Sequence, residues 1–133
     1  MIFFPPYRNG YYHENIIGPK MRIQAIHHVS LGVTDLERSR AFYREVLGLR
    51  LLKDEPGWKE LDADGCVIAL HNGSSQVGKR PPKIGFWASD VAAARDALVA
   101  RGTKLGKVMS GGGLMRCEGK DPDGNPFSIS NRP

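Results

Sequence analysis

The fold is decided by a stretch in the first third of the chain, IHHVSLGVTDLERS at residues 26–39. Residues 23–33 form a strand-like run, and from residue 27 on larger and smaller side chains alternate with the period of two that is typical of a half-buried strand. Thr34 and Glu37 follow with the spacing of a capping box, in which each side chain bonds a free backbone N–H at a helix start. A helical pattern then continues with four apolar residues on one face: Leu36, Tyr43, Val46 and Leu47. The stretch therefore predicts a strand that leads directly into a helix.

The second half of the chain repeats this pattern. The stretch KIGFWASDV at residues 83–91 leads from a strand-like run to a capping residue, either Ser89 or Asp90. The helix that follows has three apolar residues on one face: Val91, Ala94 and Leu98. Gly48 and Gly102, the expected left-handed ends of the two helices, lie about 55 residues apart. A repeat of this length indicates a duplicated supersecondary unit.

Three strand candidates follow each helix, separated by turn signals rich in Gly, Pro and Asp. They lie near residues 49–53, 58–61 and 66–72 in the first half, and near 104–108, 114–118 and 126–130 in the second. We therefore predict an α+β protein with two tandem βαβββ modules, at 22–77 and 78–133, which form one domain with a curved mixed sheet. Residues 1–21 contain many Phe, Tyr, Pro and Gly residues without a regular period, and we expect them to form an irregular arm.

Composition narrows the class of protein. The 133 residues are 41% hydrophobic and 25% charged, which suits one globular domain, and no apolar run is long enough to predict a membrane span. The net charge of +5 favours anionic ligands, but Lys and Arg are scattered, so we expect no nucleic-acid partner. Cys66 and Cys117 form no disulfide framework, and we interpret them as small core residues of a cytoplasmic protein.

The strand period assigns side chains to the two faces of each sheet. Under the first helix we expect the larger set of the first strand: His27, Val29, Leu31 and Val33. The smaller set faces open space: His28, Ser30 and Gly32. In the strand near 114–118, Met115 and Cys117 are expected to point inward. Each sheet thus has a helix-covered face and an open, more polar face, and together the open faces predict a cup for a small organic molecule.

The stretch at 26–39, continued by Ala41-Phe42-Tyr43 and Val46-Leu47-Gly48-Leu49, resembles the vicinal oxygen chelate superfamily. So does Asp121-Pro122-Asp123-Gly124-Asn125-Pro126 near the end of the chain. This superfamily includes glyoxalases, fosfomycin and bleomycin resistance proteins, methylmalonyl-CoA epimerases and extradiol dioxygenases. The resemblance covers about residues 22–131 and implies a glyoxalase/bleomycin resistance-like cup and a homodimer. It does not imply one reaction, because the fold hosts many chemistries and non-enzymatic binders.

Members of this superfamily that use a metal hold a divalent ion with His or Glu residues from the first and last strands of each module. By resemblance these positions are His28, Ala69, Lys83 and Ser128. Only His28 is an ordinary metal ligand. His71, two residues beyond Ala69 on the same face, is a candidate for a displaced set of ligands with His28 and Glu118. We therefore expect no cofactor and keep a divalent metal as an alternative.

Several residues of the open faces are candidates for binding or catalysis. Because histidine titrates near neutral pH, His28 and His71 are candidate catalytic groups for proton transfer. Lys83 would pair with a carboxylate or phosphate of a ligand if it enters the cup, and Trp87 would supply an aromatic wall. The expected ligand-binding set is completed by Ser30, Arg116, Glu118 and Ser128. Each residue also has a purely structural interpretation, such as a lysine at the rim in solvent or a tryptophan that fills the core.

The sequence thus predicts a domain that binds a small, partly apolar, anionic organic molecule, with the metal site of the superfamily largely lost. Such a domain would sequester the molecule or transform it by acid–base chemistry. One alternative is a divalent-metal-dependent lyase, isomerase or dioxygenase that uses displaced ligands. A second alternative is a non-catalytic structural subunit whose cup is empty of ligand, which a cup filled by the protein's own side chains would favour.

Overall fold

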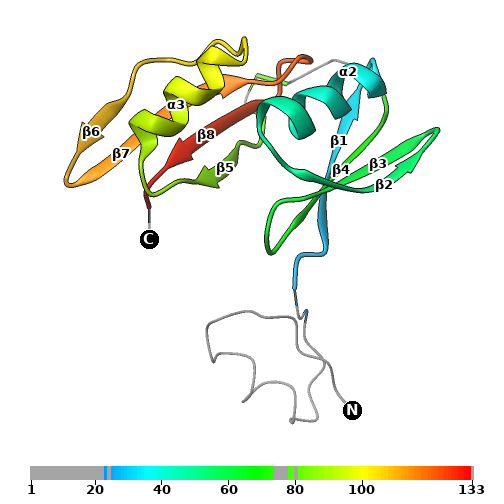
Figure 1. Ribbon diagram of the computed structural model, residues 1–133. Helices are drawn as coiled ribbons and strands as arrows, with labels where there is room; N and C mark the ends of the chain where they lie inside the picture. The colour runs from blue at the N-terminus through cyan, green and yellow to red at the C-terminus, as the bar shows by residue number, and fades with distance from the viewer. Residues whose placement is uncertain (1–22, 24, 74–77, 80, 133) are drawn as a thin grey trace, which may run out of the picture.

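The computed structural model describes residues 23, 25–73, 78–79 and 81–132 (Figure 1). The predicted irregular arm at 1–21 lies outside these residues. No helix in the described part of the chain has the length and apolar character that a membrane span requires.

Each half of the described chain forms a four-stranded mixed sheet with one helical segment. The first half contains β1 (His28–Val33), α2 (Leu36–Ala41), η2 (Phe42–Val46), β2 (Arg50–Glu55), β3 (Trp58–Asp62) and β4 (Val67–Asn72), with the sheet order β1-β4-β3-β2. The second half contains β5 (Ile84–Trp87), α3 (Val91–Ala100), β6 (Met109–Gly111), β7 (Leu114–Lys120) and β8 (Pro126–Ser130), with the order β5-β8-β7-β6. In both sheets the first strand runs parallel to the last, and the α+β class and tandem βαβββ pattern are confirmed.

The first helix begins one residue later than predicted, and its cap differs. Asp35 is the N-cap, and its side chain accepts a hydrogen bond from the backbone N–H of Arg38 at 3.1 Å. The predicted box of Thr34 and Glu37 is wrong, because Thr34 bonds Asp123 in the second half and Glu37 pairs with Arg40 and Lys59. After Ala41 the helix widens into the π-helical turn η2 before it ends at Gly48, whose φ of +80° confirms the left-handed end.

The second helix begins at Asp90, which caps the N–H of Ala93 at 3.0 Å, and ends at Gly102 with a φ of +96°. The strand predicted near 104–108 is replaced by an isolated bridge between Leu105 and Gly119, and the strand lies later, at β6. Arg95 on α3 donates hydrogen bonds to the carbonyls of Leu105 and Gly106, so this segment is held against the helix and meets β7 only at that bridge.

The helix-covered faces of both sheets merge into one core. Phe42 and Tyr43 from the first half pack with residues of the second half, and the rings of Phe42 and Phe127 lie 6.0 Å apart. Cys117 is fully buried, whereas Cys66 is only half-buried. Met115 is exposed rather than inward, since it lies in the β6–β7 hairpin that extends beyond α3 (Figure 1).

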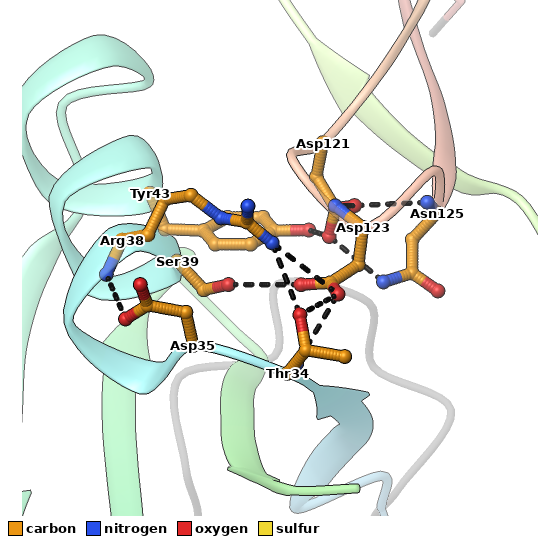
Figure 2. A network of polar contacts seen from close by, with 8 residues as sticks. All are labelled: Thr34, Asp35, Arg38, Ser39, Tyr43, Asp121, Asp123 and Asn125. Atoms are coloured by element: carbon orange, nitrogen blue, oxygen red, sulfur yellow. Dashed lines mark hydrogen bonds and ion pairs between the residues drawn. The ribbon is translucent and has the colours of Figure 1, made fainter. Parts of the chain in front are cut away.

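A polar network from the loop at 121–125 joins the two halves (Figure 2). The phenol of Tyr43 donates a hydrogen bond to Asp121 Oδ2 at 2.7 Å, and burial beside that carboxylate strongly raises the pKa of the phenol. Asp123 accepts hydrogen bonds from the backbone and hydroxyl of Thr34, at 3.1 and 2.7 Å, and from Ser39 at 3.3 Å. The side chain of Asp123 is 1% exposed, so its charge depends on these donors and on Arg38.

The contacts of Asp123 should make stability depend on pH. Burial raises the pKa of this carboxyl, but the bonds from Thr34 and Ser39 and the charge of Arg38 outweigh burial and hold the pKa below 3.8. A group with a lowered pKa in the folded state stabilises the fold above its unfolded pKa and loses that contribution as the pH falls through the folded value. We therefore expect Asp123→Asn to be less stable at pH 6, with the difference from the unchanged protein shrinking towards pH 3.

Urea unfolding at both pH values measures this difference. Asp96→Asn, on an exposed position of α3, is the matched control and should change stability by less than about 0.5 kcal/mol at either pH. A difference for Asp123→Asn that stays constant from pH 6 to pH 3 would contradict the role of its charge.

Candidate functional site

The open face of the first sheet carries a cluster of aromatic rings. Trp58 on β3 lies beside two histidines, with its ring 5.7 Å from that of His28 on β1 and 6.1 Å from that of His71 on β4. The Nδ1 atoms of His28 and His27 are 2.8 Å apart, so one ring donates to the other. His27 precedes β1 and is exposed, which corrects the prediction that it packs under the helix.

A carboxylate, that of Glu60, lies beside this cluster on the same face of β3. Trp58 Nε1 donates a hydrogen bond to Glu60 Oε2 at 2.7 Å, and Lys53 Nζ lies 3.7 Å from the same oxygen. The bond from Trp58 lowers the pKa of Glu60, and the charge of Lys53 lowers it further, against the opposing effect of burial. Glu60 is therefore an ionised group although it is only 8% exposed. Its neighbour across the β3–β4 pair is Ala69, which is fully buried even though it lies on the open face.

The open face of the second sheet carries a cluster of charges. Lys83 Nζ donates to Glu118 Oε1 at 2.8 Å, and Arg116 Nη1 lies 3.7 Å from the same oxygen. The bond from Lys83 lowers the pKa of Glu118, with further contributions from the charges of both cations and against the effect of burial. All three side chains are partly open to solvent.

Small residues lie between this charge cluster and an exposed tryptophan. Gly85 on β5 faces Ser128 on β8, and a Cβ at Gly85 would lie 3.6 Å from Ser128 Oγ. Trp87, two residues further along β5, is 65% exposed. It therefore does not fill the core. This face has an exposed aromatic ring at Trp87, small residues at Gly85 and Ser128, and the charge cluster beside them.

The structure brings the predicted residues together in two groups. Lys83, Arg116 and Glu118 meet on the second sheet, while His28 and His71 meet through Trp58 on the first. Ser30 is exposed on β1 opposite Ala69. Within the described residues no bond, ion pair or ring contact joins the two groups. Sequence reasoning missed Trp58 and Glu60, although their separation by two residues on a predicted strand would have placed them on one face.

A groove of about 1200 Å³ also lies between the two halves. Its walls are mostly apolar and include Val29, Ile68 and Phe86, while Lys83 and Trp87 lie along it. The other predicted site residues do not line it, so β5 is where the groove and the charged open face meet.

The donors present do not fit the divalent metal that the resemblance implies. Ala69 has no donor atom, Lys83 carries a cation that is paired with Glu118, and Ser128 is a weak ligand. The displaced set of His28, His71 and Glu118 is not assembled, because Glu118 lies in the charge cluster of the other sheet. Across the described ranges, no three His, Cys, Asp or Glu side chains converge in a way that would hold a metal ion.

The charge cluster leads to a direct measurement. Because the bond from Lys83 is the largest effect that lowers the pKa of Glu118, Lys83→Ala should move that pKa up towards its ordinary value. Carbon-13 NMR titration of the Glu118 side-chain carboxyl measures it. Lys107→Ala, at an exposed lysine outside the cluster, is the matched control and should leave the value unchanged. An unaltered Glu118 pKa in Lys83→Ala would mean that the two side chains are not paired in solution.

Known proteins place this chain in a family. Residues 25–129 match the family model described as Glyoxalase/Bleomycin resistance protein/Dioxygenase superfamily. A stretch of 51 residues is 39% identical to the metallothiol transferase FosB of Lysinibacillus sphaericus (strain C3-41), and it covers 38% of this chain and 36% of that relative. The chain therefore matches only about a third of this relative's length.

Solved structures give the same result. The antibiotic-binding protein TnmS3 from Streptomyces sp. CB03234 is similar with a TM-score of 0.69 and 25% identity, over 83% of this chain and 97% of that one. Lactoylglutathione lyase from Agrobacterium tumefaciens has the same fold, with a TM-score of 0.68 and 21% identity over 83% and 95% of the two chains. With the family model spanning most of its length, this chain belongs to the glyoxalase/bleomycin resistance protein/dioxygenase superfamily.

Proposed function

We propose that this protein binds a small, partly apolar organic anion on the open face of the second sheet. The observation that carries the proposal is that Lys83 and Arg116 share the single carboxylate of Glu118, within reach of solvent. This group of three has one positive charge in excess. An anionic ligand that replaces Glu118 as the partner of the two cations would form charge-assisted hydrogen bonds there.

The surroundings of the charge cluster suit a ligand with an apolar body. Trp87 offers an exposed ring. Between it and the cations lie the small residues Gly85, Ser128 and Ser130. Apolar walls with a few fixed polar groups are typical of small-molecule sites. The similarity to TnmS3, which is described as an antibiotic-binding protein, supports sequestration, whereas His28 and His71 would serve acid–base chemistry if the ligand is transformed.

The proposal includes a homodimer, as the resemblance implies. It also includes a metal site that is largely lost, because only His28 among the four ligand positions is an ordinary metal ligand. It also includes a cytoplasmic location, which the free thiols of Cys66 and Cys117 support. The rival function is a divalent-metal-dependent lyase, isomerase or dioxygenase, and it is favoured by His28 at the first-strand ligand position. A structural subunit is favoured by the burial of Ala69, since side chains of this protein already cover part of the first open face.

Two substitutions of opposite charge test the binding site. Benzoate, an anion on a flat ring, is titrated into the labelled protein while the indole N–H signal of Trp87 is followed by NMR. Lys83→Ala should weaken benzoate binding about tenfold or more, because it removes a charged hydrogen-bond donor. Glu118→Gln should strengthen binding, because it removes the carboxylate that competes for the two cations. Lys107→Ala is the control and should bind as the unchanged protein does.

Equal affinity for benzoate in Lys83→Ala and Glu118→Gln would contradict the proposed site.

The rival function, a metal-dependent enzyme, is tested by elemental analysis of the purified protein after incubation with zinc, nickel, manganese and ferrous iron. Metal near one equivalent that survives dialysis and is lost in His28→Ala would support the metal-dependent enzyme. Light scattering at several concentrations measures whether the protein is a dimer.

A further inference from the structure

The open face of the first sheet contains a carboxylate, Glu60, of which only one oxygen has a partner in the described residues. Both contacts of Glu60, with Trp58 Nε1 and with Lys53 Nζ, fall on Oε2. The other oxygen, Oε1, has no hydrogen-bond partner among the described residues. No side-chain nitrogen or oxygen in those residues is both sealed from solvent and without a partner, so Oε1 opens onto the face. An ionised carboxylate that is mostly buried therefore presents one free acceptor to whatever lies on the sheet.

The hydrogen bond to Trp58 gives no role to Glu60 Oε1. Oε2 alone holds the indole, and Lys53 at 3.7 Å is too far for a strong hydrogen bond and is itself more than half exposed. The same carboxylate is hydrogen-bonded to Trp58, whose ring lies 5.7 Å from that of His28 and 6.1 Å from that of His71. Flat rings and a fixed acceptor are complementary to a planar group that carries N–H donors.

We propose that Glu60 and Trp58 form a second recognition site, for a planar nitrogen group with N–H donors such as an amidine on an aromatic ring. The N–H groups would donate to Glu60 Oε1, and the ring would lie against Trp58. This inference rests on the proposed function, because it assumes that the open faces receive a small molecule. It adds that the ligand carries a hydrogen-bond-donating end in addition to an anionic end.

The two recognition sites can be observed separately, because the chain has only two tryptophans and one lies in each site. Trp58→Phe and Trp87→Phe assign the two indole N–H signals in nitrogen-15 NMR spectra of the full chain. Benzamidine is the probe for the Glu60 site, and benzoate has the same ring with the opposite charge. We expect benzamidine to shift the Trp58 signal with saturation and benzoate not to shift it.

Glu60→Gln keeps the shape of the side chain and removes its charge. We expect it to weaken benzamidine binding about tenfold or more, because a hydrogen bond to a charged acceptor is lost. Glu45→Gln, at an exposed glutamate on η2 outside both sites, is the matched control and should leave the benzamidine titration of Trp58 unchanged. If Glu60→Gln does not fold, the contrast between benzamidine and benzoate in the unchanged protein still tests the site.

Three results would overturn the inference. The first is that benzamidine causes no saturable shift of the Trp58 signal, and the second is that Glu60→Gln binds benzamidine as tightly as the unchanged protein does. The third is that the Trp58 signal responds to zinc but not to benzamidine. The last result would assign Glu60 and His28 to a metal. Failure here with success of the benzoate titration at Trp87 would leave the proposed function standing. The reverse result would overturn the proposed function on the second sheet and leave the Glu60 site.

Discussion

The interaction on which the rest of the structure depends is the insertion of two aspartates of one half into the other half. Asp121 organises its own loop by accepting bonds from the backbone of Asp123 and Asn125 at 2.9 and 2.8 Å, and its second oxygen accepts from Tyr43. Asp123 is thereby held against the start of α2 (Figure 2). A buried carboxylate is tolerated only where donors converge on it, so this loop fits in one orientation. The relative placement of the two sheets, and of their open faces, follows from that orientation.

The duplicated halves have diverged in the charge of their open faces. In the first half the fixed charge is the carboxylate of Glu60, which is hydrogen-bonded to Trp58 of the aromatic cluster. In the second half two cations surround one carboxylate. The same topology thus presents an acceptor on one sheet and an excess of donors on the other. A ligand that bridges them would need both an anionic group and N–H groups, which is a narrower class than net charge alone implies.

Much of the fold was predictable from local signals. The structure differs from those predictions where a side chain bonds a residue of another element. The two helices, the glycines at 48 and 102 and the tandem strands follow from periodicity and capping, which act within a few residues. Thr34 was misassigned because its hydroxyl bonds Asp123, 89 residues away, instead of its own helix. At the strand predicted near 104–108, Arg95 of α3 bonds two backbone carbonyls and holds the segment against the helix, which strand period alone does not predict. At the site, Lys83 and Glu118 were both named, but only the strand pairing shows that they meet. Glu60 was missed although its main partner, Trp58, lies two residues away on the same strand, because the period of two shows a shared face but not the hydrogen bond between the two side chains.

The contacts around Ala69 and Lys83 support the proposal that the metal site is largely lost, and they do so for separate physical reasons. Across the strand pair from Ala69 lies Glu60, and one oxygen of its carboxylate is held by Trp58. For both Glu60 oxygens to bind an ion, that indole bond would have to break. At Lys83 the ammonium group repels a dication and already neutralises Glu118, the other acidic candidate. Restoring a ligand at one position would leave the obstacle at the other, because the two positions lie on different sheets. Binding that relies on the protein's own fixed charges is therefore the simpler chemistry for this pair of faces.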